Sequence, residues 1–489
     1  MVTNAINVLI ICISAFIPLL LGERARLKST GSIEDFILQN RRLKLVPMYA
    51  TVFATYMSAF AFMGGIGYFL DHGPIYMTTV GWDMLFAVLF ILLGRRIWFY
   101  GRRYGYMTAT EFFDGIYDSK TLSITVTVIT ILCTMLYLQA QIAGAVILIE
   151  ISTGGIISPF AGGLVFFSIL VIYLWEGGMR AVAMTDMFYG ILIVIAMLST
   201  GFFLIHTAGG ADKVFNDIIE MDPLNVSISR ETGKEQIAMW VCLFIVVPVG
   251  AFMGPQIWIR NYASSSASNF SVLPILLGIS SIICIGTLCS GSASVIMAEP
   301  DSEPLEAVMR LINGNGHPLF YGFVTVGIFA AIFSTANSQV HALAAVYTID
   351  IHKKYVNNKL PSRRLVSLAK WAILVVATIS YILMMVMPRN LFDLAVVGMG
   401  GIAQLIVPTA GALFWKNSSA RAAEAGILSG EAVFIAMMLL VRLDASICAV
   451  AGHVVNTAVF VILSVNTFPE VSVSRRIASC KREYDSRDY

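Results

Sequence analysis

The sequence predicts an all-α membrane protein that crosses the bilayer many times. Hydrophobic residues make up 57% of the 489 residues and charged residues only 13%, whereas soluble domains carry about 25% charged residues. A helical crossing needs about 20 predominantly apolar residues, and runs of this kind recur along the whole chain. Positive charges are also divided unevenly between the segments that join these runs.

Reading the apolar runs between charged or Gly/Pro-rich breaks gives thirteen predicted spans: 4–22, 45–70, 75–94, 121–149, 158–175, 184–206, 237–259, 271–297, 318–349, 366–387, 391–415, 422–441 and 446–468. If the N-terminus is outside, the segments on the inner side hold 26 of the 32 Lys and Arg residues. A missed or additional span would reverse the side of every later loop and remove this asymmetry. The sequence therefore predicts 13 transmembrane helices, N-out and C-in.

Composition also excludes several classes of function. The net charge of +2 is too small to indicate nucleic acid as a partner, and the seven cysteines form no CxxC pair that would indicate a zinc site. No nucleophile–base pair or metal cluster emerges, so we do not expect an enzyme. The partners are instead the lipid bilayer and a small-molecule solute, and the location is the cell (plasma or inner) membrane as a multi-pass protein. The inner segment 469–489 is a short charged tail that we expect to be mobile.

The four letters AFMG occur in spans two and seven, which run in opposite directions through the membrane. The first copy is followed by Gly64, Gly65 and Gly67, and the second is framed by Gly250 and the Gly254-Pro255 pair. Glycine and proline both weaken a helix interior, and transporters built from inverted repeats break such helices near the bilayer midplane. We therefore expect an unwound binding region in both spans. The alternative is that these glycines only allow helices to pack closely.

Asp83 lies within span three, in the run TTVGWDMLFAVLF. An ionisable group inside a span is expensive and indicates function by default. It could face a solute cavity or act as a proton-sensitive gate. The alternative is an acid near the outer third of the span that water reaches from outside. The roles of His341 and His453 are left open, since each could be a neutral histidine in helix packing.

Span nine carries a polar cluster inside an otherwise apolar helix. Five polar residues occur within six positions: Ser334, Thr335, Asn337, Ser338 and Gln339. Hydroxyl oxygens and freed backbone carbonyls are hard ligands that suit a sodium ion, and a monovalent cation requires no carboxylate. The alternative is that these hydroxyls bond back to their own helix or to neighbouring helices. The density of polar residues favours an ion site.

The run EGGMRAVAMTDMFYG, from Glu176 to Gly190, resembles the signature of the sodium/solute symporter family. ATYMSAFAFMGG and AAIFSTANSQ are similar to the second and ninth helices of that family, and the thirteen-span plan is also the family's. The resemblance covers essentially the whole chain. It implies a leucine-transporter-type fold of two inverted five-helix repeats, here spans 2–6 and 7–11.

The resemblance divides the chain into six parts: a peripheral helix at 1–22, the first repeat at 45–206, an outer loop at 207–236, the second repeat at 237–415, peripheral helices at 422–468, and the inner tail at 469–489. It also implies one conserved sodium site, with ligands from the broken second helix and from the ninth. Carried over by motif, these ligands are the residues Ala54, Met57, Ala331, Ser334 and Thr335.

Asp186 matches the family's signature aspartate, near the inner end of span six. In some members this acid helps to bind a second sodium ion, which would here involve Asn337 and Ser338 as well. Asn337 stands where serine is more usual, which leaves the second ion open. The alternative is that Asp186 is an acid favoured by a helix N-terminus and paired with Arg180.

The solute is expected to bind at the breaks in spans two and seven, beside spans three and eleven. The candidate contacts are Tyr56, Ser58, Phe60, Phe62, Asp83, Gln256, Trp258, Gly401 and Gln404. Sugar-transporting members carry acidic and amide side chains in span two, and SAFAFMGG has none. Span seven looks more like that of the pantothenate and monocarboxylate branch. Arg260 matches the arginine of that branch, whereas Ser265 stands where the branch usually has a lysine. Phe60, Phe62 and Trp258 could also only pack the scaffold.

The resemblance therefore implies a sodium-coupled symporter that imports a small organic solute by alternating access, with Na+ as the coupling ion. A small carboxylate, such as a monocarboxylate or a pantothenate-like molecule, or an amino acid is the expected solute. We expect the protein to function as a monomer. The alternatives are a sodium/sugar-type symporter and, from different classes, a channel or a transporter-like sensor. A channel would show polar stripes along several spans, and a sensor normally carries a soluble signalling domain.

Overall fold

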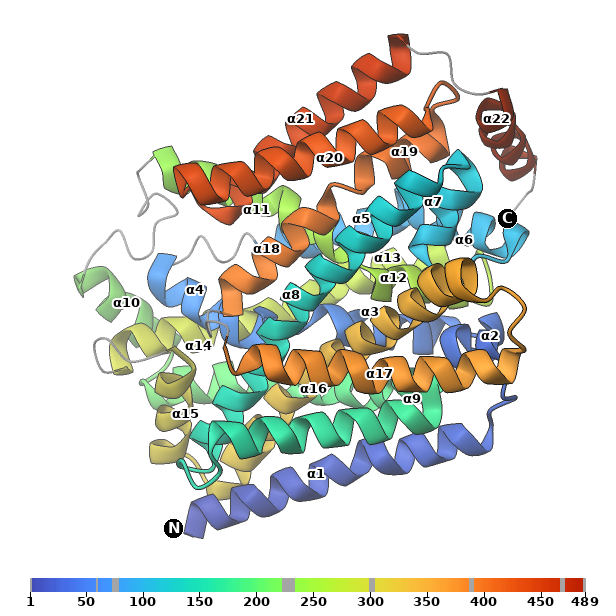
Figure 1. The fold of residues 1–489 in the computed structure, drawn as a ribbon. Coiled ribbons are helices and arrows are strands. Elements are labelled where there is room, and N and C mark those ends of the chain that lie inside the picture. Colours follow the sequence, from blue (N-terminus) through green and yellow to red (C-terminus); the bar gives the residue numbers. More distant parts are fainter. Residues whose placement is uncertain are drawn as a thin grey trace.

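The computed structural model describes residues 2–58, 60–72, 79–221, 234–298, 304–386, 391–466 and 471–486. In these ranges the regular structure is helical, apart from one parallel bridge between Leu43 and Ser264. The long helices lie side by side along one direction, as Figure 1 shows, with α10 and α15 at one end of the bundle and α2, α7 and α22 at the other. The expected all-α architecture is confirmed.

The N-terminal half contains the helices α1 (Val2–Leu27), α2 (Ile33–Leu38), η1 (Gln39–Arg41), α3 (Leu45–Tyr56), η2 (Phe60–Gly64), α4 (Gly65–His72), α5 (Thr79–Leu89), η4 (Phe90–Gly94), α6 (Arg95–Tyr104), α7 (Ala109–Tyr117), α8 (Lys120–Ser152), α9 (Pro159–Thr207) and α10 (Ala211–Met221). Predicted spans five and six both lie in α9, whose two arms meet at Gly178. This residue has a φ of 50°, which glycine adopts at no steric cost.

The C-terminal half contains α11 (Lys234–Met253), α12 (Pro255–Ala263), α13 (Asn269–Ser280), η7 (Ser281–Ile283), α14 (Cys284–Met297), α15 (Pro304–Asn315), α16 (Pro318–Val346), η8 (Tyr347–Val356), α17 (Ser362–Met384), α18 (Leu391–Ala403), α19 (Ile406–Phe414), α20 (Ala420–Ala436), η9 (Met437–Val441), α21 (Ala445–Asn466) and α22 (Val471–Asp485). Each of the thirteen predicted spans coincides with a helix, a helical arm or an interrupted helix. Among the described residues, nine helices are long and apolar enough to cross a membrane, and ten if the bent pair α11–α12 is one span. The count of thirteen and the sidedness stay predictions.

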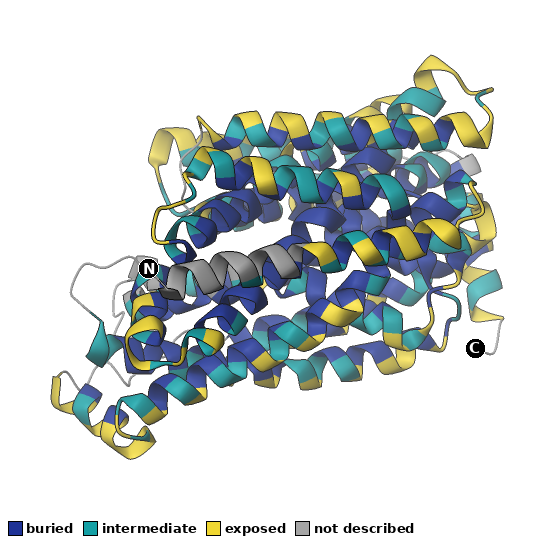
Figure 2. Ribbon diagram, turned by 90° about the horizontal axis from the view of Figure 1, so that it is seen from below, coloured by how far each residue is buried: buried dark blue, intermediate teal, exposed yellow. Residues whose placement is uncertain are grey.

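The outer helices present apolar side chains on the outside of the bundle. On α17 the exposed apolar side chains follow one face of the helix and include Trp371, Val375, Ile379 and Ile382, each at least 45% exposed. Figure 2 shows such exposed stripes on the outermost helices around a buried interior. In a soluble protein a continuous apolar surface of this kind would be a liability. Here it is the surface that a bilayer covers.

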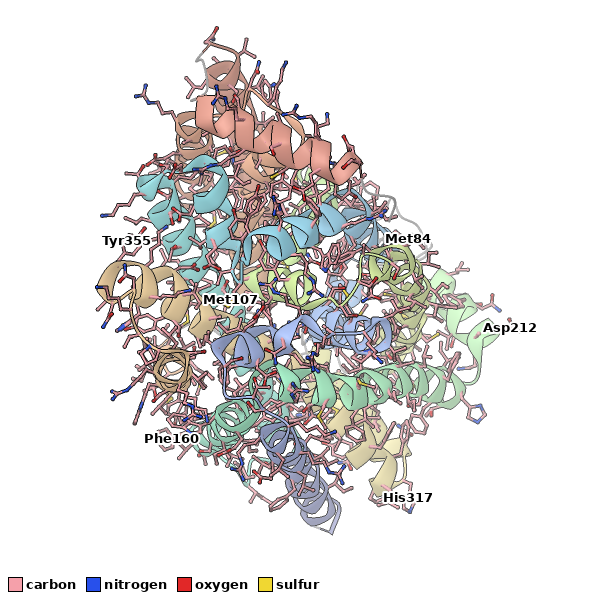
Figure 3. All side chains as sticks on the ribbon, turned by 90° about the vertical axis from the view of Figure 1, so that its right-hand side faces the viewer. Met84, Met107, Phe160, Asp212, His317 and Tyr355 are labelled. Carbon is pink, nitrogen blue, oxygen red and sulfur yellow. The ribbon has the colours of Figure 1, made fainter. Side chains whose placement is uncertain are left out.

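α16 lies at the centre of the bundle, and every residue from Val324 to Val346 is buried. It contacts α3, α8, α9 and α17. In Figure 3, which looks along the helices, the buried residue Met107 lies toward the middle and Tyr355 and Asp212 lie at opposite margins. Buried polar groups need hydrogen-bond partners, and the hydroxyls of Ser334 and Thr335 find theirs both on α16 itself and on α3.

The expectation of a mobile C-terminal tail is wrong for residues 471–485, which form α22. This helix packs against α6, α7 and α19. Arg476 donates to the carbonyl of Gly115 at 2.8 Å and pairs with Asp118 at 3.0 Å, and Glu483 pairs with Arg103 at 3.0 Å. The charged residues that suggested a solvated tail are therefore the residues that dock it.

Candidate functional site

Spans two and seven are both interrupted, at different places relative to AFMG. α11 and α12 meet at 53° around Gly254, whose ψ of 138° is extended. A residue before proline avoids the helical conformation, and Pro255 has no N–H to continue the hydrogen-bond ladder. α3, by contrast, ends at Tyr56, before the first AFMG copy, and Met57 has a ψ of 78°. The predicted interruptions are confirmed, but the glycines after the first copy lie within η2 and α4 and do not make the break.

The break at the end of α3 exposes backbone carbonyls to α16. The hydroxyl of Ser334 lies 2.7 Å from the carbonyl oxygen of Ala54, and that of Thr335 lies 2.9 Å from the carbonyl oxygen of Thr55. Both hydroxyls also lie close to the carbonyl oxygen of Ala331, at 3.1 and 3.2 Å. Five oxygens, three from carbonyls and two from hydroxyls, thus gather where α3 meets α16.

Four of the five residues predicted as sodium ligands are brought together in this way: Ala54, Ala331, Ser334 and Thr335. The fifth, Met57, is buried at the end of α3, three residues beyond Ala54. Thr55 is an additional oxygen donor that sequence reasoning missed. A set of neutral carbonyl and hydroxyl oxygens fits a hard monovalent cation. In this structure the hydroxyls of Ser334 and Thr335 donate hydrogen bonds to the carbonyls of α3, which brings the five oxygens close together.

Arg260 on α12 forms an ion pair with Asp186 on α9 in the interior of the bundle. The guanidinium lies 3.2 Å from the carboxylate, and the two side chains are 1% and 0% exposed. Arg260 also donates to the hydroxyl of Thr51 at 2.9 Å, to the carbonyl of Gln256 at 2.8 Å and to the hydroxyl of Ser338 at 2.6 Å. Thr51 donates in turn to Asp186. A buried pair is tolerated only with such additional hydrogen bonds.

Of the three residues considered for a second sodium ion, Asp186 and Ser338 contact the Arg260 guanidinium, and Asn337 accepts a hydrogen bond from Ser338 at 3.0 Å. Ser338 Oγ lies 2.7 Å from the carbonyl oxygen of Ser334 and 3.1 Å from Thr55 Oγ1, which connects this cluster to the oxygens between α3 and α16. The alternative partner for Asp186, Arg180, is wrong: Arg180 pairs with Asp35 at 2.8 Å.

Asp83 lies on α5 beside the end of α3 and is 7% exposed. The hydroxyl of Tyr56 and the thiol of Cys284 both donate hydrogen bonds to its carboxylate, the thiol from 3.6 Å. The Tyr56 ring stacks on Phe86, with ring centroids 4.2 Å apart and planes 7° from parallel. Two of the predicted solute contacts, Tyr56 and Asp83, thus touch each other. Cys284 and Phe86 join them and were not predicted.

The other predicted solute contacts on span two are only partly described. Ser58 is buried and lies 3.5 Å from the hydroxyl of Tyr137 on α8. Phe62 is buried in the core. The side chain of Phe60 lies outside the described part of the structure. The first two are consistent with a pocket wall around the break, and Tyr137 is a further polar group beside it.

The structure gives two other candidates a packing role. Trp258 is fully buried, and its described ring contacts are with Phe112, Phe113 and Tyr262. Gly401 faces Cys133 so closely that a Cβ atom would lie 2.4 Å from the sulfur. These contacts belong to helix packing, which is the alternative that the sequence left open for Trp258.

Gln404 and Gln256 also have structural partners. The side-chain amide of Gln404 donates to the carbonyl of Ala449 at 3.0 Å, and Asn456 donates to its side-chain oxygen at 3.1 Å, so this amide joins α18 to α21. The side chain of Gln256 packs against Gly254 at the bend, while its oxygen has no hydrogen-bond partner among the residues that the structure describes. Both residues stay predicted solute contacts, and Gln404 also joins two helices in this structure. His341 packs between helices, with Nε2 3.0 Å from the carbonyl oxygen of Phe36.

Comparisons with known proteins agree with this geometry. A model of the sodium:solute symporter family matches residues 36–430. The sequence is similar to the sodium/pantothenate symporter of Escherichia coli (22% identity, 85% of this chain and 86% of the relative) and to a sodium/proline symporter of Staphylococcus aureus (25%, 91% and 88%). It is also similar to an uncharacterized symporter of Bacillus subtilis (22%, 85% of each chain).

Solved structures resemble the fold. The structure of a Na+-coupled sialic acid symporter in a substrate-bound outward-open state has a TM-score of 0.82 at 17% identity and covers 95% of this chain and 98% of its own. A nucleobase-cation-symport-1 family transporter in a closed conformation has a TM-score of 0.60 at 12% identity, covering 90% and 97%. At these identities the likeness concerns the fold alone, and it supports the transporter architecture.

Proposed function

The chain belongs to the sodium:solute symporter family, and from this premise we propose that the solute it carries is a small organic carboxylate or an amino acid. Its family and its apolar helices make it a multi-pass membrane transporter that couples solute import to sodium by alternating access, and not an enzyme. The printed names of its relatives, which include pantothenate and proline symporters, support this solute class over a sugar. So does the absence of acidic and amide side chains from SAFAFMGG.

The coupling ion binds between α3 and α16, to oxygens of Ala54, Met57, Ala331, Ser334 and Thr335. The observation that carries this proposal is the approach of the Ser334 and Thr335 hydroxyls to the carbonyls freed at the end of α3. α3 belongs to the proposed first repeat (45–206) and α16 to the second (237–415). An ion held by both links the two repeats, which are the parts that move against each other in alternating access. Ion binding therefore favours the conformation in which the solute pocket is complete.

At the position considered for a second sodium ion, the protein itself supplies the positive charge. Asp186 and Ser338 both contact the Arg260 guanidinium, and Ser338 also bonds to Asn337. The guanidinium carries the positive charge that a second sodium ion would bring. Two cations there would repel each other strongly in a medium of low dielectric constant. The transport cycle thus uses one sodium ion for each solute molecule.

Proteoliposome uptake tests both statements. Ser334→Ala and Thr335→Ala each remove one oxygen of the site and are expected to abolish sodium-dependent uptake at sodium concentrations that saturate the unmodified protein. Thr325→Ala is the matched control, because the Thr325 hydroxyl bonds within α16, to the carbonyl of Tyr321 at 2.9 Å. It is expected to leave uptake unchanged.

The sodium titration of the same preparation gives the stoichiometry. We expect a Hill coefficient of one, and one sodium ion entering for each solute molecule in isotope flux. Unchanged sodium affinity in both variants would contradict the site between α3 and α16. A coefficient near two would instead assign a second ion to Asp186, Asn337 and Ser338. Accumulation of solute against its gradient separates the symporter from a channel, and uptake itself separates it from a sensor.

A further inference from the structure

We propose that Asp83 binds the ammonium group of the transported solute, so that the solute is an amino acid or another small amine and not a carboxylate without nitrogen. This inference rests on the proposed function and names the chemistry of the solute. It is carried by three features of Asp83: its position at the break of α3, the neutrality of its partners and the aromatic surface beside it.

The position of Asp83 connects it to the ion site. Tyr56, which donates to the Asp83 carboxylate, is the last residue of α3 and follows Thr55 directly. The carbonyl of Thr55 accepts from Thr335, in the cluster of oxygens between α3 and α16. A group held by Asp83 therefore binds one residue away from the proposed sodium ligands. This is where a co-transported solute has to bind if its binding and that of sodium depend on the same break.

The partners of Asp83 leave its charge uncompensated. Tyr56 and Cys284 are neutral donors, and in the described ranges no basic side chain lies within ion-pairing distance of this carboxylate. An ionised carboxylate away from water is strongly unfavourable unless a cation joins it. Asp186 has such a cation in Arg260. Asp83 therefore needs either a proton or a positive charge that the described chain does not provide.

The surroundings of Asp83 favour an ammonium group over a metal ion. Sodium prefers several hard oxygen ligands, whereas the described groups here are one carboxylate, one phenol and a thiol, which is soft. An ammonium group needs only two or three directed acceptors, and a carboxylate with four lone-pair sites and two donors already bound can supply them. The stacked rings of Tyr56 and Phe86 add a surface that attracts organic cations.

The test compares solutes that differ only in the nitrogen. L-Proline and tetrahydrofuran-2-carboxylate form one pair, and L-alanine and propionate form another. Each is added in excess to sodium-loaded protein in detergent for thermal unfolding, and those that stabilise are then assayed as competitors and substrates in proteoliposome uptake across a wider panel of amino acids and amines. We expect the stabilising solutes to carry nitrogen, with at least a tenfold weaker effect for each deaminated partner.

Asp83→Asn is the matching variant, because the amide has the shape of the carboxylate without its charge. We expect it to raise the KM for the amine at least tenfold and to leave the sodium concentration for half-maximal stabilisation within twofold. That sodium-dependent stabilisation also shows that the variant is folded. Asp217→Asn, at an acid on α10 paired with Lys213, is the control and should transport normally.

Three outcomes would overturn the inference. Sodium-dependent stabilisation by the deaminated carboxylates and not by amines would leave the proposed function standing and remove Asp83 as the ammonium site. A weaker sodium affinity in Asp83→Asn, with amine selectivity unchanged, would make Asp83 an ion ligand. Uptake driven by a pH gradient and lost in Asp83→Asn would make it a proton carrier. Absence of sodium-dependent uptake of any solute would count instead against the proposed function.

Discussion

Asp186 and Asp83 are both buried in the helices of this protein, but the structure satisfies their charges differently. Asp186 is 0% exposed and faces Arg260 at 3.2 Å, with Thr51 as a further donor. Asp83 is 7% exposed and accepts only from the phenol of Tyr56 and the thiol of Cys284. The first carboxylate has a fixed cation, and the second has none in the described chain.

This difference separates structural charge from transported charge. The cation that faces Asp186 is a side chain of the protein, so it joins α9 to α12 in this structure and is not itself transported. The charge of a carboxylate that no basic side chain faces is neutralised only when a mobile cation, such as a proton or a bound ammonium group, joins it. The oxygens between α3 and α16 are a third arrangement, because their neutral carbonyls and hydroxyls suit an ion that must also leave.

Breaking the Asp186–Arg260 pair is expected to have the largest effect on stability. Arg260→Gln leaves the Asp186 carboxylate buried without a cation, and such a change costs about 3–5 kcal/mol. The thermal unfolding midpoint of the purified protein in detergent should therefore fall strongly. The measurement is made without solute, so that binding does not contribute.

The double variant sharpens this result. Asp186→Asn together with Arg260→Gln leaves two neutral amides and should recover a large part of the loss, since the cost of the single change comes from the charge left alone. If the double variant is no more stable than Arg260→Gln, the loss reflects the hydrogen bonds of Arg260 to Gln256 and Ser338 and not the pair.

The sequence identified both aspartates as unusual but not their partners. An acid inside an apolar run is visible in any hydropathy reading, and so is Arg260 near the end of span seven. Which of these charges meet depends on how α9 and α12 pack, and the two residues are 74 positions apart. Proximity along the chain suggested Arg180 for Asp186, whereas Arg180, two residues after the Gly178 kink, reaches Asp35 on α2.

The two helix breaks likewise differ in how far the sequence alone could predict them. The break at Gly254 could be predicted, because Pro255 removes a backbone donor and restricts the residue before it. The end of α3 at Tyr56 carries no such local signal. Its carbonyls are satisfied by Ser334 and Thr335, each 280 positions away, so only the packing of α16 determines where the helix stops.

Asp83→Asn is expected to lower stability much less than Arg260→Gln does. Asp83→Asn removes a charge that has no basic partner in the described part of the chain and keeps an oxygen to accept from Tyr56 and Cys284. The free energy of unfolding without solute should therefore change by only about 1 kcal/mol or less. Thermal unfolding in detergent measures it beside Arg260→Gln. A loss as large as that of Arg260→Gln would mean that Asp83 has a charged structural partner, and the contrast between the two aspartates would disappear.

The smallest effect is expected where an ion pair lies in water. Arg103 and Glu483 join α6 to α22 at 3.0 Å, with side chains 53% and 26% exposed, and exposed pairs contribute about 0–1 kcal/mol. Glu483→Gln should therefore shift the unfolding midpoint slightly, and less at high salt, which screens surface charges. α22 should stay docked, because the Tyr484 ring lies against Arg96 at 4.3 Å and Arg476 still holds the carbonyl of Gly115. A shift as large as that of Arg260→Gln would show that burial does not decide how much a charge pair contributes here.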